Sequence, residues 1–184
     1  YSTIWSRVMT SILKVDNIKD SADNQAMSIS SGVVTINNGI NWGNENLTSY
    51  REGTWSPVFT STSCTFGSNG YSVGTYTKIG NVCNLQFRMS AGTIGGTTSN
   101  QAFISGLPFT VKNTTDLISA TMLYCIYINL NTNFYFLAGY HMPNTTTLAL
   151  YQNGDNGGET TVTPAMFNAN ATQIRGSITY QTEA

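Results

Sequence analysis

The stretch Val82-Cys-Asn-Leu-Gln-Phe-Arg-Met89 decides the fold class of this chain. Every second residue from Cys83 to Met89 is apolar, and the residues between them are Asn, Gln and Arg. A period of two is typical of a β-strand with one packed face and one face toward water or a neighbour. Two residues, Gly80-Asn81, separate this run from the one ending at Ile79, which is the length of a tight hairpin turn.

Short runs with strand character continue on both sides, separated by glycine-rich or asparagine-rich turns. The predicted strands are 56–60, 74–79, 82–90, 101–105, 117–129, 134–140, 146–151 and 173–180. About eight strands with frequent turn signals and no helical periodicity are typical of a β-sandwich or jelly roll. We therefore expect an all-β fold, with a jelly-roll-like β-sandwich over residues 50–184.

The first part of the chain has a different pattern. Residues 12–38 hold short alternating apolar runs, punctuated by Asp-Asn, Ser-Ser-Gly and Asn-Asn-Gly. The apolar members are Leu13, Val15, Ile29, Val34 and Ile36. Such runs are too short to bury a face alone, so we expect them to wrap around copies of themselves as a shaft. A strand pair packed on the main domain is the alternative. Residues 1–49 are thus predicted to be a shaft or attachment segment.

Composition limits the possible partners. Charged residues make up 9% of the chain, against about 25% in an average soluble domain. The net charge is −1, so the chain has no basic footprint for nucleic acid or an anionic membrane. No apolar run approaches the ~20 residues that span a bilayer. We expect no nucleic-acid partner and no membrane insertion.

The residues that usually carry chemistry are few. An odd count of three cysteines without short spacing argues against a disulfide framework and a zinc site, so we interpret them as reduced and structural. His141 is the only histidine, and no nucleophile elbow accompanies it. Asp155 and Glu159 lie in a glycine-rich loop, whereas a catalytic carboxylate pair needs rigid placement. That loop also lacks EF-hand spacing. We therefore predict that the chain is not an enzyme and that it binds neither a metal nor a cofactor.

Four segments carry distinctive motifs: residues 47–59 with Glu-Gly-Thr-Trp-Ser-Pro, residues 71–82 with Tyr-Thr-Lys-Ile-Gly-Asn-Val, residues 104–109 with Ile-Ser-Gly-Leu-Pro-Phe, and residues 173–182. In this order they resemble the opening "YEEGTWTP", the "G-x-Y-T-K-I-G-N-x-V" element, the "ISGLPF" element and the closing strand of a domain that is common in phage tail-fibre and related virion proteins. Residues 12–20 resemble an N-terminal element of small marine-phage structural proteins.

The resemblance implies an intertwined homotrimer at the end of a fibre or spike. It implies a virion protein that assembles in the host cytoplasm and is exposed on the particle surface. Its N-terminal segment would dock to other virion proteins, and its β domain would bind a host cell-surface glycan or protein. The family motif contains no catalytic residue, so none is carried over.

Tyrosine and asparagine concentrate in the second half of the chain. Tyrosine offers a flat amphipathic ring, and asparagine both donates and accepts hydrogen bonds, as a sugar-binding surface needs. Weak single sites would gain from threefold avidity. Packing of these tyrosines between sheets or subunits is the alternative. The candidate ligand-binding residues are Tyr124, Tyr127, Tyr135, Tyr140, Tyr151 and Asp155.

Other functional classes stay open. The same fold would suit a capsid decoration, head-fibre or collar protein that binds no receptor. A small depolymerase is disfavoured by the single histidine and by the stretch 53–115, which contains no acidic residue. A free-standing bacterial lectin is disfavoured because residues 1–7 lack the basic start and apolar stretch of a signal peptide.

Overall fold

A computed structural model describes residues 17–19, 25–30, 33–36, 40–41, 46–47, 49–67, 70–114, 118–155 and 158–183. The chain divides into two units, Tyr1–Thr48 and Ser49–Ala184. Nearly every regular element in both units is a strand, so the fold is all-β. The helical structure among the described residues is a single 3-10 turn, Pro164–Met166.

The first unit contains short antiparallel strands. β1 (Asn17–Lys19), β2 (Gln25–Ser30) and β3 (Val33–Ile36) form a sheet in that order, and β4 (Ile40–Asn41) pairs with β5 (Asn46–Leu47). The apolar residues expected to alternate here fall on β2 and β3, where Ile29 is directly opposite Val34. Leu13 and Val15 lie outside the described residues.

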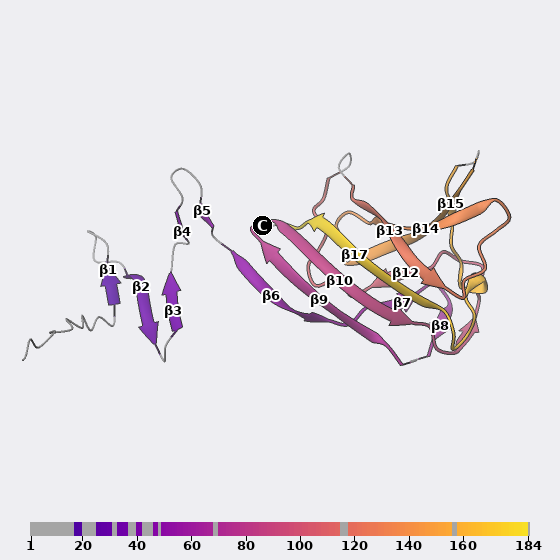
Figure 1. Cartoon of the computed structure of the whole chain (residues 1–184), viewed down its shortest axis with the longest axis horizontal. Helices are drawn as coiled ribbons and strands as arrows, with labels where there is room; N and C mark the ends of the chain where they lie inside the picture. Colours follow the sequence, from indigo (N-terminus) through magenta and orange to yellow (C-terminus); the bar gives the residue numbers. More distant parts are fainter. Residues whose placement is uncertain are drawn as a thin grey trace, which may run out of the picture. The chain divides into compact units, whose positions relative to one another are not determined.

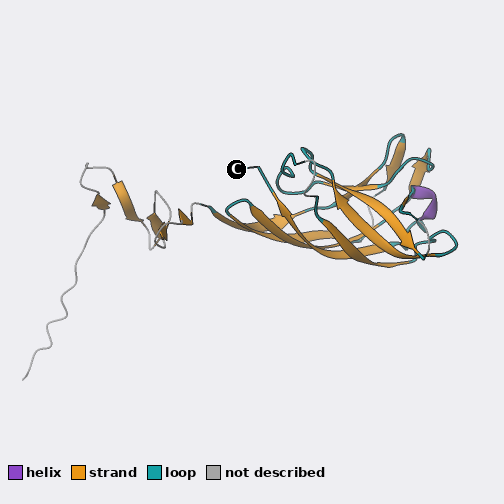
Figure 2. Ribbon diagram, turned by 90° about the horizontal axis from the view of Figure 1, so that it is seen from above, coloured by secondary structure: helices purple, strands orange, loops and turns teal. Residues whose placement is uncertain are grey.

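The second unit is a β-sandwich made from one long antiparallel sheet (Figures 1 and 2). Its strand order is β6-β9-β10-β17-β13-β14-β15-β12-β7, with β16 beside β15 and a separate pair of β8 and β11. The strands β6, β9, β10 and β17 lie side by side as one layer (Figure 1). β13 belongs to both halves, because it pairs with β17 through its second part and with β14 through its first. The bounds are β6 Tyr50–Trp55, β7 Val58–Thr60, β8 Cys64–Phe66, β9 Ser72–Ile79, β10 Val82–Ser90, β11 Ile94–Gly96, β12 Phe103–Ser105, β13 Ala120–Ile126, β14 Phe134–His141, β15 Thr147–Gly154, β16 Thr160–Thr161 and β17 Gln173–Gln181.

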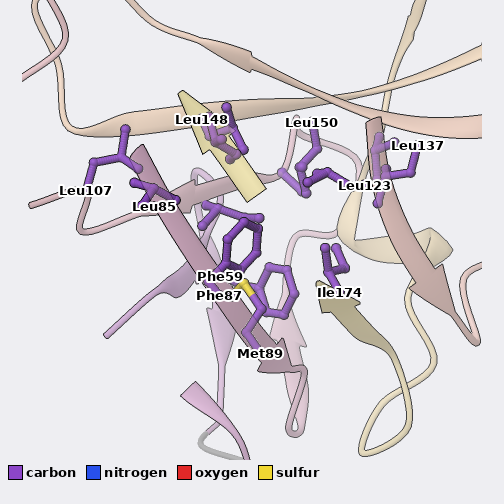
Figure 3. Packing of buried hydrophobic residues seen from close by; sticks show 14 of the residues in the cluster. Phe59, Leu85, Phe87, Met89, Leu107, Leu123, Leu137, Leu148, Leu150 and Ile174 are labelled. Atoms are coloured by element: carbon purple, nitrogen blue, oxygen red, sulfur yellow. The ribbon is translucent and has the colours of Figure 1, made fainter. Parts of the chain in front are cut away.

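The core lies between the two halves of this sheet. The alternate apolar residues of β10 all point inward, and Cys83 and Leu85 are fully buried. They gather with Leu148 and Leu150 of β15 and with Leu137 of β14 (Figure 3). The predicted alternation of 82–89 is therefore confirmed, and it leaves the polar residues of β10 on the outer face of the sheet.

Two glycines on neighbouring strands each lie under an aromatic ring. Trp55 is directly opposite Gly74, and Gly53 is directly opposite Tyr76. A Cβ on Gly74 would be 2.1 Å from Trp55 Nε1, and one on Gly53 would be 2.9 Å from the Tyr76 hydroxyl. Each ring thus occupies space that a side chain on the facing strand would fill, a known way to stabilise glycine in a sheet.

Several strand predictions were wrong in detail. The predicted strand 56–60 is β7, which begins at Val58, and the polar strand β6 before it was not predicted. The predicted strand 117–129 is β13, which begins at Ala120, and residue 117 lies outside the described residues. β13 ends at Ile126, because Tyr127 adopts a left-handed φ of 56° that does not continue a strand. β8 and β11 were missed, since three residues are too few for a periodic signal.

Candidate functional site

The outer face of the layer β6-β9-β10-β17-β13 presents cross-strand rows of side chains. Residues directly opposite each other in antiparallel strands share a face, with Cβ atoms about 4.5–5.5 Å apart. One such row crosses β9, β10, β17 and β13 and consists of Val73, Arg88, Arg175 and Tyr124. The row is therefore basic in its middle and apolar or aromatic at both ends.

The neighbouring rows are polar and almost uncharged. The next row along the strands contains Thr54, Thr75, Gln86 and Ser177. The one after it contains Glu52, Thr77, Asn84 and Thr179, where Asn84 Nδ2 donates to Thr179 Oγ1 at 2.8 Å. Hydroxyl and amide groups thus cover the centre of this face, and these groups both donate and accept hydrogen bonds.

Arg88 is held in one orientation by its neighbours. Its guanidinium lies 3.6 Å from the centre of the Tyr71 ring, and its Nη2 donates to Gln173 Oε1 at 3.1 Å. Its Nε is buried and has no hydrogen-bond partner among the described residues. Arg175 is exposed, with its guanidinium 6.0 Å from the Tyr124 ring. Within the described part of the chain, neither guanidinium makes an ion pair with a carboxylate.

A groove runs beside this basic row. It has a volume of about 580 Å³, and Thr54, Val73, Thr75, Gln86 and Arg88 of the outer face contribute to its lining. A second hollow of about 380 Å³ lies next to it, and its lining includes Phe66, Tyr71 and Met89. The first volume is in the range of about 300–1,000 Å³ that is usual for ligand pockets.

The predicted tyrosines do not form one cluster. Tyr124, Tyr127 and Tyr135 are exposed, at 61%, 64% and 63%. Tyr140 and Tyr151 are half-buried on β14 and β15, and their rings meet edge to face with centroids 6.0 Å apart. The structure therefore brings Tyr140 and Tyr151 together and places Tyr124 opposite Arg175.

Asp155 lies where β15 ends. Its side chain is exposed, and its backbone N–H donates to Asn133 O at 3.2 Å. Glu159, the acidic residue nearest to it in the sequence, is exposed too. No group of three or more His, Cys, Asp or Glu side chains suited to a metal ion occurs among the described residues.

Sequence reasoning missed the arginines and two exposed apolar side chains. Met122 and Phe136 are exposed on β13 and β14. The alternation of 82–89 already places Arg88 on the outer face, so Arg88 had a local signal. The alternation of 173–180 places Arg175 on one face in the same way, but only strand pairing brings it opposite Arg88.

His141, for which the sequence indicated no catalytic role, is a core residue at the end of β14. It is fully buried, its ring stacks on Tyr180 with centroids 4.8 Å apart, and its Nδ1 is 2.9 Å from Ser119 O. That contact assigns the proton to Nδ1, and it leaves Nε2 buried without a partner among the described residues. Burial lowers the pKa of His141 below its ordinary value.

The cysteines are free thiols. Cys83 is fully buried, while Cys64 and Cys125 are half-buried. Burial raises the pKa of all three thiols, which disfavours the reactive thiolate. No helix in the described part of the chain is long and apolar enough to span a membrane.

Comparisons with known proteins gave no match. No protein-family model matches the chain, and no curated protein or solved structure is significantly similar to it. The functional proposal below is therefore supported by the residues of the outer face and by the motifs described above.

Proposed function

We propose that this chain is a phage virion fibre or spike protein, a homotrimer whose β-sandwich displays a surface for attachment to host-cell glycans. The observation that carries the proposal is the outer face of β6-β9-β10-β17-β13. It combines neutral hydroxyl and amide side chains with exposed aromatic rings, and a groove is open beside them. Saccharides offer both hydroxyl groups and apolar ring faces, so this face fits them chemically.

The binding mode would be recognition without turnover. Side chains such as Thr75 and Gln86 would exchange hydrogen bonds with sugar hydroxyls, and Tyr124 would stack on an apolar sugar face. Each contact of this kind is weak in water. Three copies on one particle would raise the overall avidity without any new contact.

Self-association is supported by two features. The sheet of the first unit consists of strands of 3, 6 and 4 residues, and so small a sheet gains stability by packing against another surface. In the second unit, Tyr50, Ile79 and Val82 form an exposed apolar row across β6, β9 and β10. Exposed apolar groups on adjacent strands favour contact with another protein surface. We propose that the first unit also docks to other virion proteins.

The same apolar row favours a second candidate function. A capsid decoration, head-fibre or collar protein would use this row for contact with its neighbours and would need no receptor. Such a protein would assemble on the particle but would bind no saccharide.

Light scattering and a saccharide-binding screen together test the proposal. We expect the full chain to have a mass near three times 19.9 kDa and to bind at least one bacterial surface saccharide. Tyr124→Ala should weaken that binding, whereas Arg51→Ala, which changes an exposed side chain on the opposite face of β6, serves as the comparison. A trimer that binds no saccharide would favour the decoration function, and a monomer that binds none would refute the trimeric attachment protein.

A further inference from the structure

We propose that the outer face holds a subsite for an acidic saccharide, built on Arg88 and Arg175. This inference rests on the proposed glycan-binding function and names the class of glycan. It begins from the pairing of the two arginines, which are directly opposite each other on β10 and β17. Both side chains therefore project from the same face, with Cβ atoms about 4.5–5.5 Å apart.

Two like charges in direct cross-strand opposition destabilise a sheet. The chain has only eight basic residues, and two of them occupy this one pair of positions. No described carboxylate pairs with either guanidinium, and the nearest rows on this face are hydroxyl and amide rows. Glu52 is the acidic residue of this face, two rows away, where it accepts a hydrogen bond from the Tyr50 hydroxyl at 2.7 Å.

Neutral neighbours orient the Arg88 guanidinium, and no carboxylate among the described residues compensates the charge of Arg88 or Arg175. Arg88 is held between the Tyr71 ring and the Gln173 amide oxygen, both of which are neutral. Arg175 faces the neutral ring of Tyr124. Arg88 is already held in one orientation, so little of its side-chain freedom is lost when an anion binds, and the exposed Arg175 adds a second positive charge directly opposite it.

The groups around Arg88 and Arg175 indicate which class of ligand would carry the anionic group. Guanidinium groups bind planar carboxylates through two parallel hydrogen bonds, and they bind tetrahedral oxyanions such as sulfate through pairs of oxygens in the same way. The groove beside Arg88 has the Thr54, Thr75 and Gln86 side chains for sugar hydroxyls, and Tyr124 offers a ring for stacking. Long polyanions need many basic contacts, whereas this face has two. A saccharide with one carboxylate or sulfate per unit fits better than a nucleic acid.

An array tests the class of ligand with the full chain. It would carry acidic bacterial saccharides, the methyl ester of each, sulfated saccharides, neutral saccharides and single-stranded DNA. If the chain binds an acidic saccharide and does not bind the methyl ester of that saccharide, the ligand is a carboxylate. If it binds sulfated saccharides alone, the ligand is a sulfate. Neutral saccharides bound as well as acidic ones, or DNA bound in their place, would overturn the acidic subsite. The first of these outcomes would leave the glycan-binding function standing, and no saccharide bound would overturn both.

Variants test the residues. Arg175→Gln should weaken binding of the best acidic saccharide by about 10- to 100-fold, the effect of losing hydrogen bonds to a charged group. Arg51→Gln removes the same charge from a position of β6 that alternates away from this face, and its affinity should stay unchanged. Because Arg175 is exposed, the substitution should preserve the circular dichroism spectrum. Equal affinities for Arg175→Gln, Arg51→Gln and the unaltered chain would overturn the proposal.

Discussion

Replacing Gly74 by alanine should destabilise the second unit by about 2 kcal/mol. The added methyl group would be 2.1 Å from Trp55 Nε1 and 2.6 Å from its Cε2, well inside van der Waals contact. The Trp55 ring would have to move by roughly 1 Å or more to restore an ordinary contact distance. That ring is buried, and it packs edge to face against Phe87 with centroids 5.6 Å apart.

The magnitude follows from three effects. Overpacking in a well-packed core costs about 1–3 kcal/mol. The shift would also break the hydrogen bond of 3.4 Å from Trp55 Nε1 to Gln86 O, at about 1 kcal/mol. Replacing glycine removes unfolded-state freedom, which offsets about 0.4–1 kcal/mol. The two costs exceed the gain by about 2 kcal/mol.

Urea unfolding followed by far-UV circular dichroism would measure the change, at one protein concentration. Gly158→Ala is the matched control, because a Cβ there meets no atom within 4 Å and its φ is not left-handed. It should change the free energy of unfolding by less than about 0.5 kcal/mol.

Making the same substitution in a Trp55→Leu variant tests the contact with Trp55 specifically. In Trp55→Leu the smaller side chain no longer fills the space at Gly74, so Gly74→Ala should cost at least about 1 kcal/mol less there. If Gly74→Ala leaves the unfolding midpoint unchanged, or costs the same in both backgrounds, the contact between Trp55 and Gly74 is wrong.

Three further predictions concern the core. Burial lowers the pKa of His141 below 6.5, so the unfolded chain takes up a proton at a higher pH than the folded chain does. Between pH 6.5 and the folded-state pKa, the free energy of unfolding should therefore fall by up to about 1.4 kcal/mol for each unit by which the pH is lowered. Urea melts of His141→Gln should lack this slope, and a slope that persists would contradict the assignment. Leu85→Ala, at a fully buried position, should cost about 3 kcal/mol, while Thr77→Ala on the outer face should cost under about 1 kcal/mol in the same assay; similar losses would argue against this register. In the folded chain, peptide mapping after thiol alkylation should find Cys64 labelled before Cys83, which is fully buried, and the reverse order would be inconsistent with this core.

The strand patterns that sequence reasoning identified best are those with a strong local alternation. The run 82–89 has a period of two over its whole length, and β10 and its burial pattern follow it closely. β6 was not predicted, because its residues Tyr50, Arg51 and Glu52 form a polar segment without an apolar alternation. Its strand conformation depends on pairing with β9, which no short window of sequence contains.

Some features of the candidate site also follow from local sequence, and others depend on strand pairing. Exposure of Tyr124, Tyr127 and Tyr135 agrees with their choice as surface residues, whereas Tyr140 and Tyr151 half-bury each other. Their role in binding stays a prediction. The basic pair was beyond sequence reasoning, since Arg88 and Arg175 are far apart along the chain and become neighbours through the register of β10 and β17.

The sequence by itself determined the all-β class and the inward and outward faces of strands such as β10, because side-chain alternation along a strand is a local property. Only the tertiary structure decided which strands lie side by side, and therefore that Trp55 covers Gly74 and that Arg88 meets Arg175. The physical reason is that antiparallel register is set by hydrogen bonds and packing between distant segments, and a shift of one residue would exchange every inward side chain for an outward one.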